Sequence, residues 1–187
     1  EGFTTKPFIC HDPSLPPMVG YARTAKIMAS KPSGRTKADD LETRIGYFKH
    51  IAERPAPTVT VIEDIDDPIG FGAHWGEVNS NLHKGLGSVG VVTNGSIRDV
   101  DMWAEGFGAL AGSLSPSHGW VHGVEYAVPI EVHGMVVRPG DIIHADCHGA
   151  VVIPQAAVSA IKDTVELREK AESRLIGPAQ RPGFDID

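Results

Sequence analysis

The sequence predicts an α/β fold with layered sheets, and three observations support this prediction. Between residues 58 and 115, β-branched runs alternate with short helix-like segments, which is the order typical of βαβ units on a parallel or mixed sheet. Residues 124–154 then hold four short apolar runs broken by glycine-containing turns, which predicts an antiparallel β section. A long helix-like segment follows. A chain of 187 residues suits one domain with a substantial core.

The elements can be placed by their local patterns. Strands are expected where β-branched and apolar residues run together, in residues 18–29, 58–64, 88–93 and 109–115. Helices are expected in residues 41–54, 77–87, 100–108 and 155–176. Asp39 or Asp40 would cap the first helix, and Pro55 would end it. An irregular segment of residues 1–17 and a tail of residues 177–187 complete the expected single domain.

Composition limits the classes of function. The chain is 41% hydrophobic and 22% charged, with a net charge of −7, as in ordinary globular proteins. It has no lysine- or arginine-rich block, which argues against nucleic-acid binding, and no apolar run long enough to cross a membrane. Cys10 and Cys147 form no CxxC motif. We therefore expect a reduced cytoplasmic protein with neither nucleic-acid nor membrane partners.

A candidate site lies where two predicted loops meet the ends of strands. The glycine-rich loop before Glu77 lets the backbone approach a ligand, and the helix that starts there points free amides at the same space. The following strand delivers Arg98 and Asp99 at its carboxyl end, the edge where open α/β sheets bind ligands. Amides, a guanidinium and two carboxylates are therefore expected to converge.

This set of groups suits a small carboxylate substrate together with a hard metal ion. Arg98 and the amides would hold the anionic end of the substrate, and Glu77 and Asp99 would hold Mg²⁺ or Mn²⁺. The alternative from the same residues is structural. Glu77 would then be an acid stabilised by the helix dipole, and Arg98 and Asp99 a solvated turn pair.

Four short motifs in order resemble the family that joins 4-hydroxy-4-methyl-2-oxoglutarate aldolases with RraA-like regulators of ribonuclease E. Glu77 and the Arg98–Asp99 pair, with twenty residues between them, are similar to its D-x20-R-D signature. The remaining three are GEVNS in residues 76–80, VRPGDIIHADCHGAVVIP in residues 137–154 and MVGYARTAK in residues 18–26. The resemblance runs from Met18 to the final helix.

The resemblance implies a swivelling β/β/α-type domain that assembles as a homotrimer or hexamer. It also implies a divalent-metal-dependent lyase that releases pyruvate from a small 2-oxo acid, by retro-aldol cleavage or by decarboxylation of oxaloacetate. Asp99 would be the direct metal ligand and Glu77 would act through water, although the family has aspartate at that position. The family also contains non-catalytic regulators that bind a ribonuclease, which is the alternative function.

By the same resemblance, Arg98 would bind the substrate's oxygens and stabilise the pyruvate enolate. The loop that begins at Gly76 would bind the substrate carboxylate through the amides of Val78, Asn79 and Ser80. His74, two residues before Gly76, is a further candidate that could line the pocket or move a proton.

The other histidines and acids carry weaker signals. His118 and His122, like His144 and His148, are four residues apart, but their segments are predicted as loops and strands rather than metal-binding helices. Asp141 and Asp146 occupy expected hairpin turns, where hydrogen bonding to the backbone explains them.

Overall fold

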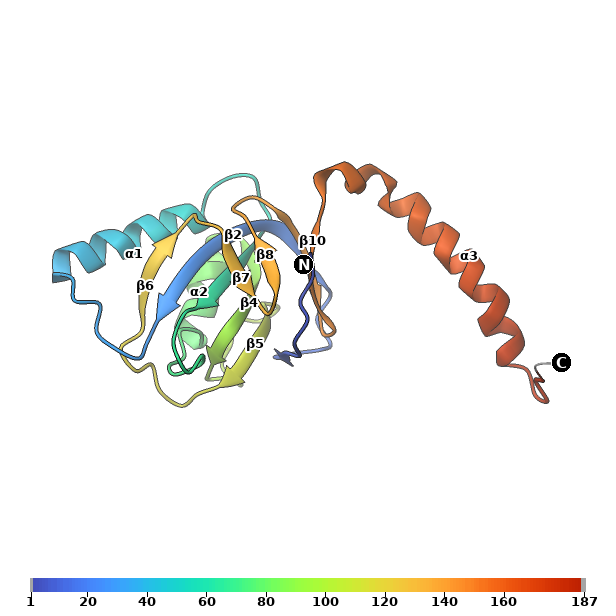
Figure 1. The fold of residues 1–187 in the computed structure, drawn as a ribbon, viewed down its shortest axis with the longest axis horizontal. Helices are drawn as coiled ribbons and strands as arrows, with labels where there is room; N and C mark the ends of the chain where they lie inside the picture. Colours follow the sequence, from blue (N-terminus) through green and yellow to red (C-terminus); the bar gives the residue numbers. More distant parts are fainter. Residues whose placement is uncertain (1, 186–187) are drawn as a thin grey trace. The chain divides into compact units, whose positions relative to one another are not determined.

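A computed structural model describes residues 2–185 of the chain. Its contacts divide them into two compact units, one running to Ile153 and the other beginning at Pro154. The first unit holds every candidate site residue, and it is a mixed α/β layered structure (Figure 1).

The first unit is built on one main sheet with strand order β1-β5-β4-β3-β2-β9-β10. The central strands β2 to β5 pair in parallel, as the alternating strands and helices predicted. The outer strands pair antiparallel, and β6 joins the far end of β2. The strands are β1 (Ile9–Cys10), β2 (Met18–Met28), β3 (Thr58–Asp64), β4 (Ser88–Ile97), β5 (Gly108–Leu114), β6 (His122–Tyr126), β9 (Ile142–Asp146) and β10 (Gly149–Ile153).

Two hydrophobic clusters lie on opposite faces of this sheet. Because side chains alternate along a strand, Val61 of β3 joins one cluster while its neighbour Ile62 joins the other. The first cluster packs the sheet against the hairpin of β7 (Ile130–Val132) and β8 (Met135–Val137). The second packs it against helix α1 (Lys37–Ile51). The result is a β/β/α layering, which confirms the predicted fold class.

Helix α1 begins at Lys37, two residues before Asp39, so the predicted cap requires correction. The cap is Thr36, whose side-chain oxygen accepts a hydrogen bond from the Asp39 amide at 3.2 Å. Asp39 and Asp40 lie in the first helical turn, where a carboxylate favours the helix dipole. The helix runs beside β6 and β2 (Figure 1).

The predicted helix at residues 100–108 is wrong, because this segment forms consecutive turns. Two of its hydrogen-bond donors bind residues of other segments instead of forming helical hydrogen bonds. The Trp103 indole donates to the Arg98 carbonyl at 2.8 Å, and the Ala104 amide donates to the Ser80 hydroxyl at 3.0 Å. The turns fix the backbone next to Asp99, at the end of β4.

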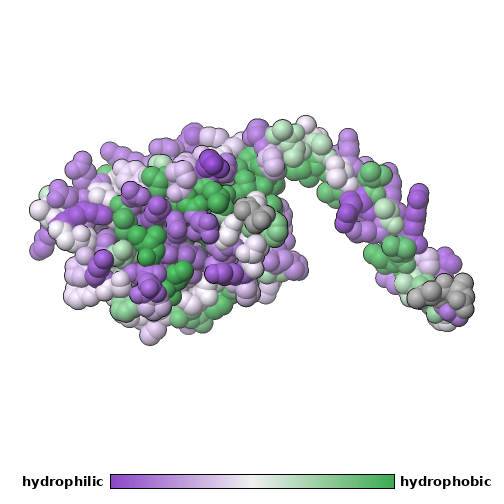
Figure 2. All heavy atoms as spheres, viewed as in Figure 1, coloured by the Kyte–Doolittle hydropathy of each residue, from purple (hydrophilic) through white to green (hydrophobic). Residues whose placement is uncertain are grey.

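The second unit consists of a 3₁₀ helix (Gln155–Ala160) followed by α3 (Ile161–Ala179), where one continuous helix was predicted. Apolar and charged residues alternate along it (Figure 2), and Leu167 and Leu175 are exposed. No helix in residues 2–185 combines the length and the apolar character needed to cross a membrane.

Candidate functional site

The end of β4 brings Asp99 directly against Gly76. A side chain at Gly76 would place its Cβ 2.6 Å from Oδ2 of Asp99 and 3.3 Å from Cγ of Arg98, so any larger residue would displace the Asp99 carboxylate. The Arg98 amide donates to the Trp75 carbonyl at 2.9 Å, which holds the two segments together. The structure therefore brings Gly76, Arg98 and Asp99 together, as the sequence predicted.

Asp99 has an unusual backbone conformation. Its φ of 50° lies in the left-handed region, which aspartate adopts more readily than most residues. The chain turns sharply here, and the Met102 amide donates to the Asp99 carbonyl at 2.9 Å. This turn points the carboxylate back towards Gly76 rather than along the strand direction.

Helix α2 (Glu77–Gly85) starts beside this carboxylate, with Gly76 as its N-cap. The Ser80 amide donates to the Gly76 carbonyl at 3.0 Å, so the helix itself uses that amide. The Ser80 hydroxyl is buried and bonds the Glu77 carbonyl. Of the three amides expected to hold a substrate carboxylate, only those of Val78 and Asn79 therefore lie in the unbonded first turn.

The guanidinium of Arg98 uses only some of its hydrogen-bond donors within the described structure. Its Nη2 lies 3.3 Å from Oδ2 of Asp99, and the two side chains are 33% and 28% exposed. Its Nε is buried and has no hydrogen-bond partner among residues 2–185. A buried donor without a partner is costly, and a bound anion would satisfy it.

The predicted metal ligands fit a hard divalent cation in chemical type. Asp99 offers a partly exposed carboxylate, and Glu77 is exposed at the first position of α2, directly after Gly76. Two carboxylates leave most positions of an octahedral ion to water and substrate, which is how proteins commonly bind Mg²⁺.

The other glycines of this loop serve packing rather than ligand approach. A Cβ on Gly72 would lie 2.3 Å from the His118 carbonyl oxygen, and one on Gly70 would lie 2.5 Å from the Ser113 hydroxyl. The expectation that the whole glycine-rich loop opens to a ligand is therefore wrong at Gly70 and Gly72.

A network of rings supports the first turn of α2 from behind. The Nδ1–H of His83 donates to the Asn79 carbonyl at 2.7 Å, so its Nε2 accepts from the Tyr47 hydroxyl at 2.6 Å. The Asn79 side-chain amide donates to the His74 carbonyl. Trp75 is fully buried, and its ring lies 4.4 Å from that of His83. These contacts join helix α1, helix α2 and the loop that precedes α2.

Burial keeps two of these imidazoles neutral. It lowers the pKa of His74 to about 4, helped by the nearby His118, and the pKa of His83 to about 3. A histidine with a lowered pKa in the folded state binds its proton more tightly when the chain unfolds. His74 can therefore act only as a neutral hydrogen-bonding group near pH 7.

These pKa values predict an acid-sensitive fold. Below pH 6.5, the ordinary pKa of histidine, the unfolded chain binds more protons than the folded chain. The stabilisation of the fold that these neutral histidines provide is therefore fully present above pH 6.5 and falls as the pH drops towards 4. Each histidine contributes at most about 1.4 kcal/mol per pH unit in this window. Urea unfolding between pH 7.5 and 4.5 measures the slope. The His83→Gln variant should show a shallower slope, and an unchanged slope would contradict the assignment.

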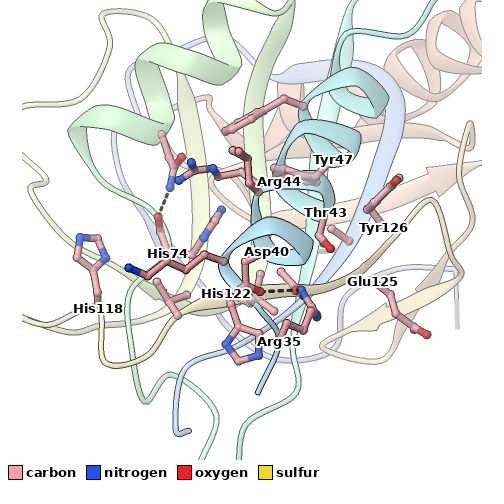
Figure 3. Close-up of a pocket in the computed structure, with 18 residues that line it drawn as sticks. Arg35, Asp40, Thr43, Arg44, Tyr47, His74, His118, His122, Glu125 and Tyr126 are labelled. Atoms are coloured by element: carbon pink, nitrogen blue, oxygen red, sulfur yellow. Dashed lines mark hydrogen bonds and ion pairs between the residues drawn. The ribbon is translucent and has the colours of Figure 1, made fainter. Parts of the chain in front are cut away.

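A cavity of about 420 Å³ lies on the α1 side of this network (Figure 3). Of the predicted site residues, only His74 and Asn79 line it; Gly76, Glu77, Val78, Ser80, Arg98 and Asp99 do not. Helix α1, which was not among the predicted site elements, supplies Lys37, Arg44 and Tyr47 to the cavity. The available signal was the seven-residue spacing of Lys37 and Arg44, which places both on one helical face.

The remaining predicted residues divide between structural roles and one exposed cluster. Asp141 accepts from the Arg138 amide and Asp146 from the His148 amide, confirming their roles in hairpin turns. In residues 2–185, the only group of three possible metal ligands within 4.8 Å is Asp146, Cys147 and His148, at the exposed β9–β10 turn. His118 bonds the Ala73 carbonyl through Nδ1 at 2.7 Å, and both His118 and His122 line the cavity.

The chain is similar to several known proteins. It is 36% identical over 110 residues to the uncharacterized protein MJ0644 of Methanocaldococcus jannaschii, covering 56% of this chain and 53% of that protein. It is also 36% identical over 72 residues to an Ectopseudomonas mendocina protein that carries the provisional name 4-hydroxy-4-methyl-2-oxoglutarate aldolase, covering 37% and 44% of the two chains. The match thus spans about half the length of these relatives.

Solved structures share the fold. RraAS2 of Streptomyces coelicolor, described as an unusual member of the RNase ES inhibitor RraA family, has a TM-score of 0.71 at 22% identity, covering 96% of this chain and 84% of that one. The RNA-processing inhibitor RraA from Thermus has a TM-score of 0.59 at 23% identity, covering 79% and 81%. The RraA-like family, described as Aldolase/RraA, matches residues 4–152, and the chain belongs to that family.

Proposed function

We propose that this protein is a divalent-metal-dependent lyase that cleaves a carbon–carbon bond of a small 2-oxo acid and releases pyruvate. The observation that carries the proposal is the contact of Asp99 and Arg98 with Gly76 at the start of α2. In the proposed site, the carboxylate and the guanidinium would act together with the free amides of the first turn of α2. The family assignment and the aldolase name of one relative support the same reaction class.

Each group has a distinct part in the proposed reaction. The amides of Val78 and Asn79 bind the substrate carboxylate, aided by the positive end of the α2 dipole. Arg98 donates to the keto oxygen, where negative charge develops as the bond breaks, and so stabilises the enolate. Asp99 and, through water, Glu77 would hold Mg²⁺ or Mn²⁺. When bound, the ion would supply Lewis-acid stabilisation of the same charge.

Retro-aldol cleavage of a 4-hydroxy-2-oxo acid breaks the C3–C4 bond after the 4-hydroxyl loses its proton. The electron pair of that bond becomes the pyruvate enolate, which then takes a proton at C3. Decarboxylation of oxaloacetate gives the same enolate with loss of carbon dioxide, so oxaloacetate is a practical test substrate. The protein would work as a homotrimer or hexamer with the cytoplasmic location expected from its sequence.

Incubation with oxaloacetate and Mg²⁺ tests the proposal. Pyruvate, measured by a coupled dehydrogenase assay, should form faster than in a protein-free control with the same Mg²⁺, because the free ion itself promotes this decarboxylation. Excess EDTA should remove the protein-dependent rate, and added Mn²⁺ should restore it. A rate equal to the protein-free control at every metal concentration would instead favour a non-catalytic, inhibitory role like that named for the two RraA structures.

A further inference from the structure

The cavity beside α1 has a chemical character that the proposed lyase does not use. Its walls combine apolar and aromatic side chains from Ile27, Tyr47, Phe48, Val121 and Tyr126. A volume of about 420 Å³ lies within the range of pockets that bind small organic molecules. It is therefore large enough for a ligand with a ring or a short hydrocarbon body.

The charges lining the cavity do not balance within the protein. Arg35 pairs with Asp40 at 3.3 Å, and Glu125 pairs with Lys26 at 3.5 Å. Lys37 and Arg44 also line the cavity; both are exposed residues of α1, and neither forms an ion pair or hydrogen bond with any residue in 2–185. Two cations on one face of α1 are thus left over after the acids are paired. Figure 3 shows Arg44 extending from α1 towards the segment that carries His74.

His74 adds a polar atom that lacks a partner. Its Nε2 is buried and bonds no atom among the described residues, while the residue as a whole lines the cavity. Buried polar atoms in native proteins are normally satisfied, so this unpaired nitrogen, in a residue that lines the cavity, is free to bond a ligand or a water. Its lowered pKa keeps the ring neutral, so it can exchange one hydrogen bond with a ligand without adding charge.

We propose that this cavity binds a small organic anion with an apolar body. The acidic group lies between Lys37 and Arg44, the body packs against Tyr47 and Phe48, and a polar atom of the ligand bonds Nε2 of His74. A fork-shaped guanidinium suits both carboxylate and phosphate. Glu77, Arg98 and Asp99 do not line the cavity, and Asn79, whose backbone amide is placed in the proposed catalytic site, is the residue that the two sites share.

Isothermal titration calorimetry with two probes, 3-phenylpropionate and phenyl phosphate, tests the proposal and distinguishes the two kinds of acid. At least one should bind the wild-type protein with a millimolar or lower Kd, and acetate and benzyl alcohol should bind at least about tenfold more weakly. Arg44→Gln should weaken probe binding about tenfold. Lys49→Gln, which removes a charge from the same helix outside the cavity, should change it less than about twofold.

The contrary results are equally specific. The proposal is overturned if neither probe binds, if benzyl alcohol binds as tightly as the acids, or if Arg44→Gln and Lys49→Gln behave alike. Chemical shifts of the Asn79 side-chain amide and the His74 ring should move on probe binding. The Asp99→Asn variant should bind the probe like the wild type, so this test can fail or succeed independently of the lyase proposal.

Discussion

Replacing Asp99 by asparagine should lower metal-dependent pyruvate release more than about a hundredfold, because the change removes the charged oxygen that would hold the cation. Asparagine has the same shape and tolerates the left-handed conformation that Asp99 adopts, so the turn should survive. The Arg98–Asp99 ion pair is about a third exposed and contributes little to folding. The measurement is the rate with oxaloacetate over a range of Mg²⁺ concentrations.

Asp101 provides a matched control for that experiment. It is exposed and lies two residues away in the same run of turns, and its side chain forms no hydrogen bond or ion pair with another residue among 2–185. Asp101→Asn removes the same charge and should retain the wild-type rate within about twofold. Equal losses in the two variants would mean that general electrostatics, rather than a metal ligand, explains the effect.

The Arg98→Lys variant should lose about a hundredfold in kcat/KM, even though it keeps the positive charge. Lysine lacks the fork that binds two oxygens at once, and loss of a donor to developing oxyanion charge typically costs a hundredfold or more in kcat. The backbone of Arg98 is held by bonds to Trp75 and Trp103 that do not involve its side chain. Thermal unfolding should therefore stay close to the wild-type midpoint.

The fall should appear mainly in kcat if Arg98 acts on the transition state, and mainly in KM if it only binds substrate. Arg138→Lys is the control, since Arg138 is exposed and distant in sequence from the site, and it should leave both constants unchanged. Wild-type kinetics in Arg98→Lys would show that the guanidinium is only part of a turn pair.

The parts of the fold that rest on local patterns could be predicted from the sequence. The strand at residues 58–64 is fully specified by its β-branched run, and β3 has the same bounds. Helix α2 begins at Glu77 as predicted, because glycine precedes it and an acid occupies its first position. The meeting of Gly76 with Asp99 followed from the rule that parallel strands bring their carboxyl ends to one edge.

The features that depend on tertiary contacts could not be predicted. Residues 100–108 have a helix-like pattern, but the Trp103 indole and Ala104 amide bond the β4 end and α2 instead. The cavity is closed by α1 together with β6, more than seventy residues later in the chain. No local pattern shows that Arg44 and His74 share one space, or that the hydrogen bonds of Ser80 are already taken.

The most direct test of the metal site is titration of the protein with Mn²⁺ followed by electron paramagnetic resonance. The wild-type protein should bind one Mn²⁺ per chain, and Asp99→Asn should lose that binding. Asp146→Asn, which alters the exposed cluster at the β9–β10 turn, should retain it. If Asp99→Asn bound Mn²⁺ as tightly as the wild type while Asp146→Asn did not, the metal would belong to the turn and the proposed catalytic site would be refuted.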